Sequence, residues 1–265
     1  MSGPTFVYID YGASPDIGLE LRYSLATLLA EAPSARVVVY TDKPEDYARL
    51  HPAVTPRALG DDLARWTRGG AFNHRIKICA LADAVDTCGG LCVLLDTDSY
   101  VEPGFAAKLE AASAVGPVMD HFERRDPFPE WAGFVADLPS GRYVYDSNAA
   151  IMYNSGLVAV RAGRDEAALA DAVALVDALY DSGRRIFLLE QFAFSETLRR
   201  RGLPIGEMAP AFQHYFRRSL KRYLHWRLRA RERRHPGFAP TRPCVTHPRN
   251  AVRAYNWAAR LGLLR

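Results

Sequence analysis

Short apolar runs alternate with longer segments of helical spacing in the N-terminal part of the chain. Residues 5–10, 36–41 and 91–95 are largely apolar, as strands buried on both faces of a parallel sheet are. Residues 19–31 and 72–85 lie between them and carry apolar side chains every three or four positions, which predicts helices. Strand, helix and strand in this order form a βαβ unit. We therefore predict an α/β fold with a mainly parallel sheet flanked by helices.

The rest of the chain continues this alternation less regularly. Further strands are predicted at residues 115–119, 151–160 and 204–208, and further helices at residues 166–180 and 188–201. Residues 121–147 have no clear period and are rich in Pro, Asp and aromatic side chains. A connection of this length in a compact domain is usually functional or mobile. We expect its aromatic rings, Trp131 among them, to form a surface for a sugar acceptor or a lid packed on the domain.

Basic side chains are concentrated near the C-terminus. Residues 212–235 contain nine Lys and Arg against one Glu, while the net charge of the whole chain is only +4, so the remainder is acidic. We therefore predict a domain over residues 1–210 and a basic, aromatic extension over residues 211–265. Within it, one helical side carries the apolar residues Phe216, Leu220, Tyr223 and Leu224. This pattern favours contact with an anionic membrane surface, with a solvated helix as the alternative and nucleic acid the least favoured partner.

Several broad classes are disfavoured by composition. The sequence has no apolar run near the roughly 18 residues that a membrane span needs, and it begins without a secretory signal pattern. The cysteines at 79, 88, 92 and 244 contain one close pair but not the second that a zinc site requires. We expect reduced cysteines and a cytoplasmic protein, with peripheral contact at the inner face of the cytoplasmic membrane.

Two acidic residues, Asp96 and Asp98, directly follow the predicted strand at residues 91–95. Ligands of open α/β sheets bind beyond the carboxyl ends of the strands. Two carboxylates at such a strand end can hold one Mn²⁺ or Mg²⁺, cations that accept oxygen ligands and leave positions for substrate phosphates. The sequence therefore predicts a divalent-metal site, and a loop cap with solvated acids is the alternative.

Five stretches of the sequence match one known pattern: residues 73–77 (NHRIK), 94–98 (LLDTD), 153–157 (YNSGL), 189–191 (LEQ) and 247–255 (HPRNAVRAY). Together they resemble family 8 of the GT-A glycosyltransferases, the family of glycogenin and of bacterial lipooligosaccharide galactosyltransferases. The resemblance extends over about residues 5–257 and implies a GT-A fold, which is Rossmann-like with a mixed sheet. The chain departs from the pattern at Glu190, where the family has Asp, and at Asn250, Arg253 and Tyr255, where it has Gly, Lys and Trp.

The resemblance implies a role for each matching residue. In the metal site it places Asp96, Asp98 and His247. It implies that the donor's diphosphate and sugar are bound by Arg75, Lys77, Asp96 and Arg253. It implies that the nucleobase and ribose are bound by Asp10 and Tyr11. The implied catalytic residues are Glu190, Gln191 and Asn154.

The resemblance also implies the reaction, which is the transfer of a hexose from a UDP-sugar to a glycan or glycolipid, with Mn²⁺ or Mg²⁺ and with retention of anomeric configuration. Inversion would require a general base, for which Glu190, Asp120, Glu123 and Asp146 are candidates. A nucleotide-sugar-binding protein without catalysis is the main alternative. A haloacid-dehalogenase-type phosphatase is less favoured because Tyr100 stands where its signature has Thr or Val. A nucleotidylyltransferase requires a Gly-rich phosphate-binding loop after the first strand. Residues 11–15 match such a loop poorly.

Overall fold

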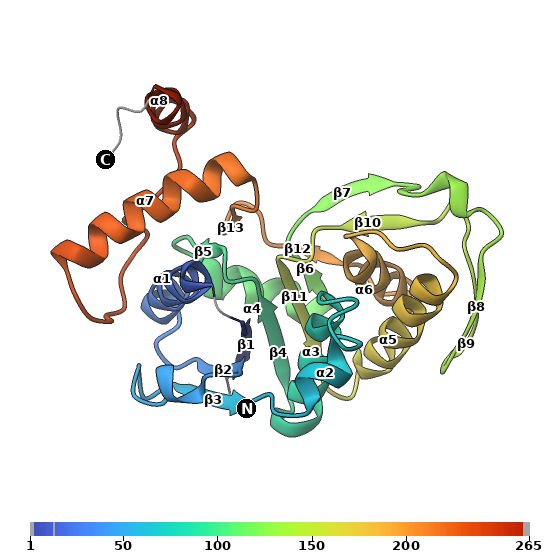
Figure 1. Cartoon of the computed structure of the whole chain (residues 1–265). Coiled ribbons are helices and arrows are strands. Elements are labelled where there is room, and N and C mark those ends of the chain that lie inside the picture. Colours follow the sequence, from blue (N-terminus) through green and yellow to red (C-terminus); the bar gives the residue numbers. More distant parts are fainter. Residues whose placement is uncertain (1–2, 13, 262–265) are drawn as a thin grey trace.

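The computed structural model describes residues 3–12 and 14–261, which form a sheet flanked by helices with a C-terminal arm (Figure 1). In chain order the elements are β1 (Thr5–Asp10), α1 (Pro15–Glu31), β2 (Arg36–Thr41), the 3-10 helix η1 (Pro44–Asp46), β3 (Val54–Ala58), α2 (Asp62–Trp66), α3 (Arg75–Cys88), β4 (Leu91–Leu95), β5 (Ser99–Val101), α4 (Phe105–Val115), β6 (Val118–Met119), β7 (Phe122–Arg125), the 3-10 helix η2 (Pro129–Trp131), β8 (Val135–Leu138), β9 (Gly141–Val144), β10 (Ile151–Tyr153), β11 (Leu157–Arg161), α5 (Glu166–Asp181), α6 (Leu189–Arg200), β12 (Gly206–Glu207), β13 (Phe212–His214), α7 (Arg218–Arg234) and α8 (Arg249–Arg260).

The central sheet has seven strands in the order β12-β6-β11-β4-β1-β2-β3. Strands β4, β1, β2 and β3 pair in parallel, as do β6 and β12, whereas β11 runs antiparallel to both β4 and β6. The fold is therefore α/β with a mixed, mainly parallel sheet, as predicted. The predicted bounds of β1, β2 and β4 are also confirmed, because strands buried on both faces leave an unbroken apolar run.

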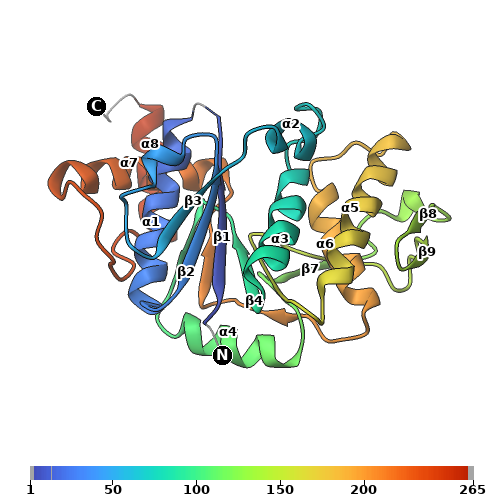
Figure 2. The same cartoon turned by 90° about the horizontal axis from the view of Figure 1, so that it is seen from below.

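Helices cover both faces of this sheet (Figure 2). Phe6 and Tyr8 of β1 point into a core shared with α1 and α4. Val7, between them, points to the opposite face and packs in the core that contains α3, α5 and α6. This alternation follows from the two-residue period of a strand. Its consequence is a sheet protected on both faces, whose polar groups meet solvent mainly at the strand ends.

The segment over residues 121–147 is ordered into β7, η2 and the β8–β9 hairpin rather than forming an open loop. Trp131 is buried, with its ring 4.0 Å from that of Phe128 and 5.3 Å from that of Phe192 in α6. The expectation of an exposed acceptor surface at Trp131 is therefore wrong, and the lid alternative holds. Aromatic residues in this segment supply apolar area to the core, which a search for periodicity does not detect.

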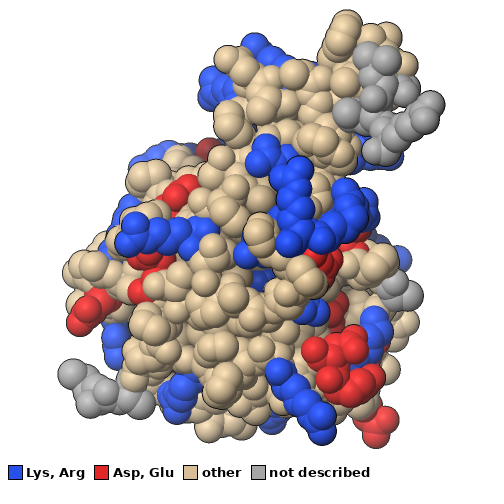
Figure 3. Space-filling model, turned by 90° about the vertical axis from the view of Figure 1, so that its left-hand side faces the viewer, with Lys and Arg blue, Asp and Glu red and all other residues tan. Residues whose placement is uncertain are grey.

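The C-terminal extension packs on the domain through helix α7. Tyr223, Leu224 and Leu228 are buried in a cluster that includes Tyr23 of α1, and α8 packs on α7 in turn. Most of the apolar side predicted to face a membrane is therefore used inside the protein, although Phe216 remains half-exposed. Lys and Arg side chains gather on the side of the molecule that carries α7 (Figure 3). Within the described residues, no helix is both long and apolar enough to cross a membrane.

Candidate metal centre and ligand cavity

The turn after β4 lies at the floor of a cavity of about 670 Å³. Backbone hydrogen bonds fix this turn at both ends. The N–H of Asp96 donates to the carbonyl of Gly156 beside β11 at 2.9 Å, and the carbonyl of Asp98 accepts from the N–H of Tyr215 at 3.0 Å. The Ser99 hydroxyl donates to the Asp96 carbonyl at 2.6 Å. The two carboxylates are thus held beyond the carboxyl end of a central strand, where open α/β sheets place ligands.

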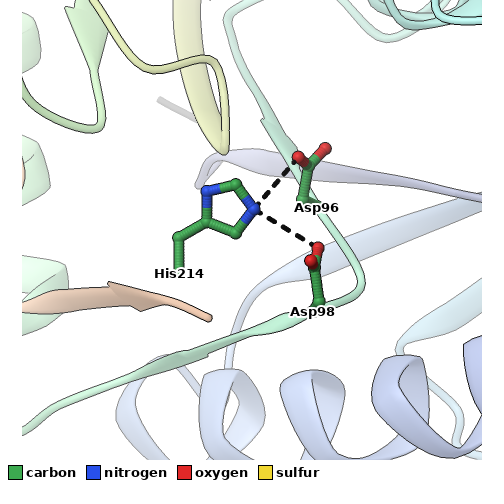
Figure 4. A group of neighbouring side chains, drawn as sticks. All are labelled: Asp96, Asp98 and His214. Atoms are coloured by element: carbon green, nitrogen blue, oxygen red, sulfur yellow. Dashed lines mark ion pairs between the residues drawn. The ribbon is translucent and has the colours of Figure 1, made fainter. Parts of the chain in front are cut away.

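His214 is brought to these carboxylates by the pairing of two short strands. β13 runs antiparallel to β5, with His214 opposite Ser99. Its Nε2 lies 3.4 Å from an oxygen of Asp96 and 3.3 Å from an oxygen of Asp98 (Figure 4). One ligand atom from each of the three residues lies within 4.8 Å of the others. The spacing suits coordination of a single ion.

Two neighbours from residues 154–156 set the position of the His214 ring. Gly156 lies directly against it, and a β-carbon there would approach His214 Nδ1 to 2.3 Å. The side-chain oxygen of Asn154 lies 2.9 Å from the same Nδ1 and also accepts the Gly156 N–H at 2.9 Å. When Nδ1 carries the proton, it donates to Asn154 and leaves Nε2 free to bind a metal. Asn154 therefore acts as a support for His214.

Two lysines neutralise the carboxylates. Lys77 of α3 lies 2.8 Å from Asp96, and Lys221 of α7 lies 2.8 Å from Asp98. Burial would lower the pKa of each lysine, but nearby carboxylates, chiefly Asp96 for Lys77 and Asp98 for Lys221, raise it. Both ammonium groups are therefore charged at neutral pH and available for a second anion.

Asp98 and His214 shift each other's protonation. Burial would raise the pKa of the Asp98 carboxyl, but its hydrogen bond to His214 and the charges of His214 and Lys221 hold that pKa well below its usual range. Burial would lower the pKa of His214, but the hydrogen bond to Asp98 and the charges of Asp98 and Asp96 raise it. Asp98 is therefore ionised, as a metal ligand must be.

A network of carboxylates and amides forms another wall of the cavity. Glu123 of β7 accepts hydrogen bonds from Asn154 Nδ2 at 2.9 Å and from Gln191 Nε2 at 3.0 Å. Gln191 Oε1 accepts the N–H of Ser155 at 3.2 Å, and Glu190 Oε1 accepts the Ser155 hydroxyl at 3.2 Å. The other oxygen of Glu190 is buried, and among the described residues it has no hydrogen-bond partner.

Seven of the residues predicted from the sequence meet at this cavity: Tyr11, Lys77, Asp96, Asp98, Asn154, Glu190 and Gln191. Asp10 lies close by but accepts a hydrogen bond from Tyr47 and lines a separate hollow with Arg22 and Lys43. The side chain of Ile9, its chain neighbour, lines the main cavity instead, because successive strand residues face opposite sides.

Three predicted residues lie elsewhere. Arg75 forms a bidentate ion pair with Asp177 of α5, at 2.8 and 2.9 Å, so its guanidinium joins two helices and not the cavity wall. His247 lies 3.0 Å from the Tyr100 hydroxyl through Nδ1, and Arg253 is exposed on α8. His214 and Lys221 line the cavity, whereas His247 and Arg253 are not among its lining residues.

The three side chains that could bind a metal suit the divalent cation that the sequence predicts. Asp96 and Asp98 offer carboxylate oxygens, and His214 offers an imidazole nitrogen on the side away from Asn154. An imidazole ligand favours a first-row transition metal over Mg²⁺, so Mn²⁺ suits this set better. The cavity beside these ligands leaves room for further ligands to complete the coordination.

Comparison with known proteins finds similarity among solved structures only. No family model matches the sequence, and no curated protein does. Among solved structures, the chain is similar to the apo structure of the bifunctional glycosyltransferase WbbM, with 11% sequence identity and a TM-score of 0.49. The match covers 78% of this chain and 38% of that one, so the chain spans well under half the length of that protein.

Proposed function

We propose that the chain is a metal-dependent glycosyltransferase that moves a hexose from a UDP-sugar to a glycan or glycolipid acceptor. The observation that carries this proposal is the convergence of Asp96, Asp98 and His214 at the floor of the cavity, with Lys77 and Lys221 beside them. Departure of a nucleoside diphosphate from a sugar requires stabilisation of about two negative charges. A group of carboxylates, imidazole and ammonium ions at a strand end is suited to that task.

Each part of the cavity has a proposed role in donor binding. Asp96, Asp98 and His214 would hold Mn²⁺, which would neutralise charge on the diphosphate as the sugar leaves. Lys77 and Lys221 would turn from the carboxylates to phosphate oxygens. Tyr11, with the apolar Ile9, Ile17 and Ile76 near it, would take the nucleobase. The sugar would then lie toward Glu190 and Gln191.

Retention of anomeric configuration is proposed for the transfer. The basis is the resemblance of residues 189–191 (LEQ) to the family 8 pattern, and Glu190 and Gln191 of α6 line the same cavity as the proposed diphosphate site. The acceptor would attack from the leaving-group side. The leaving diphosphate oxygen would accept the acceptor's proton. NMR of the product checks this, since an inverted anomer would exclude it.

Calorimetry of UDP binding tests the metal centre. We expect wild type to bind UDP with Mn²⁺ and to lose most affinity in EDTA. Asp98→Ala and His214→Ala should weaken Mn²⁺-dependent binding by more than the roughly tenfold that follows loss of a supporting hydrogen bond to a ligand. His247→Ala is the matched control, and it should leave the affinity unchanged. Binding indifferent to metal, or sensitive to His247 and not to His214, would reject the assignment.

Release of UDP from UDP-hexoses, with and without acceptor, separates the enzyme from a non-catalytic binding protein. Binding without release under any condition would favour the latter. We further propose an anionic membrane surface as the place of action, since basic residues gather on and beside α7.

A further inference from the structure

Two phenylalanine side chains stand exposed at the mouth of the cavity. Phe187 is 71% exposed and Phe216 is 49% exposed, and both line the cavity. Large apolar side chains in water are unfavourable, and such residues beside convergent polar groups are typical of ligand sites. Both rings therefore have free apolar surface that an incoming molecule can cover.

Each ring rests against a histidine of the cavity wall. Phe187, in the connection between α5 and α6, lies 4.4 Å from the ring of His74 in an edge-to-face arrangement. His74 Nδ1 is in turn 4.0 Å from Glu190. Phe216 lies 5.1 Å from the ring of His214. One phenylalanine thus lies beside His74 and the other beside His214, and both line the same cavity.

The same cavity also presents polar side chains. Glu123, Asn154 and Gln191 line it, and the carboxylate of Glu123 keeps lone pairs beyond the two amide hydrogen bonds that it accepts. A ligand that suits this mouth therefore has apolar faces for the rings and hydroxyl groups for these polar side chains. A lipid chain has only the first, whereas a pyranose ring has both.

We propose that Phe187 and Phe216 form the acceptor subsite and that its occupant is a pyranose ring. The C–H faces of the sugar stack on the two phenylalanines, and its hydroxyl groups donate to polar side chains of the cavity such as Glu123. This assignment rests on the proposed function, because it names the acceptor class of the same site.

Saturation-transfer NMR with methyl β-D-galactopyranoside and methyl β-D-glucopyranoside tests the subsite. The protein carries UDP and the diamagnetic Mg²⁺, so signals from the sugars are not broadened. We expect transfer to the ring protons of at least one glycoside in wild type. Phe187→Ala and Phe216→Ala should each raise its Kd by about threefold to tenfold, as loss of one aromatic contact does. Trp257→Ala, which removes an exposed ring on α8 outside the cavity, is the matched control and should change nothing.

Calorimetry of UDP with Mg²⁺ on the same samples separates the two proposals. If UDP binds to every variant but neither glycoside gives a signal in wild type, the subsite is wrong and the proposed function stands. An unchanged Kd in the double phenylalanine variant, or transfer to hexanol in place of the glycosides, also overturns it. If wild type fails to bind UDP with any divalent metal, the proposed function itself fails.

Discussion

A β-carbon at residue 156 would approach the imidazole of His214 to 2.3 Å, closer than real side chains come. This position shows how the candidate site depends on single residues. The Asn154 side chain bonds the same ring atom, Nδ1, so His214 is held by a hydrogen bond and against a bare backbone. Glycine is used here for close approach of the imidazole to β11, and not for an unusual backbone angle.

Gly156→Ala should displace His214 and weaken Mn²⁺-dependent UDP binding by at least about tenfold, the usual effect of losing the support of a metal ligand. Gly18→Ala is the control. It lies within α1, and its β-carbon would come no closer than 3.9 Å to Tyr47, so it should leave binding unchanged. Calorimetry measures both, with circular dichroism to confirm folding. Unchanged affinity in Gly156→Ala would mean that His214 is not a ligand.

Residue types predicted the carboxylate half of the site but not the histidine. Asp96 and Asp98 stand directly after an apolar strand, and that local pattern is enough to place them. His214 ends a strand of three residues whose partner, β5, lies more than a hundred positions earlier. No periodicity marks such a strand, and a histidine within a basic segment has no distinctive signal. Knowledge of the strand pairing was needed to find it.

At the scale of elements, helix α6 organises much of the molecule. Its first turn carries Glu190 and Gln191 into the cavity, while Phe192 anchors the aromatic segment before β10. The site wall and the lid are therefore parts of one packed unit. The sequence predicts the helix but leaves the aromatic rings above it as either an acceptor surface or a packed lid, because composition alone does not distinguish an aromatic core from an aromatic surface.

Trp131→Ala should lower the free energy of unfolding by about 3–5 kcal/mol, the range for truncating a buried tryptophan. Trp257→Ala, at 64% exposure, should change it by less than about 0.5 kcal/mol. Urea unfolding followed by circular dichroism gives both values. The folded Trp131 variant should also keep the acceptor KM of wild type. A stable variant with a raised acceptor KM would restore the original interpretation of this segment as an acceptor surface.

At the scale of the whole molecule, the basic side chains are concentrated in the C-terminal extension, over residues 211–265, and the remainder of the chain is acidic. Several basic residues of α7 are exposed, Arg218, Arg222 and Arg233 among them, because the apolar side of the helix packs on α1. Binding to an anionic surface would thus depend on charge more than on insertion of apolar side chains. This differs from the amphipathic insertion expected from the sequence, in which the apolar side was free.

Co-sedimentation with vesicles tests this surface. We expect binding to anionic but not neutral vesicles, weakened by salt, with about 1 kcal/mol contributed by each basic residue near the lipid. Arg218→Glu with Arg222→Glu, both exposed on α7, should reduce it strongly. Arg124→Glu with Arg125→Glu, exposed on β7, makes the same charge change away from α7 and should have little effect. Equal losses in both double variants would show that net charge alone matters.

The lysines paired with Asp96 and Asp98 have a thermodynamic consequence. Before these carboxylates can coordinate a cation, Lys77 and Lys221 must leave them, and each partly buried ammonium group then needs a new anion. The diphosphate of the donor provides such anions, whereas water does so poorly. Metal and nucleotide should therefore bind cooperatively, and by linkage each strengthens the other by the same factor. Lys221 belongs to α7. The free energy of that cooperation therefore also depends on how stably α7 packs on α1.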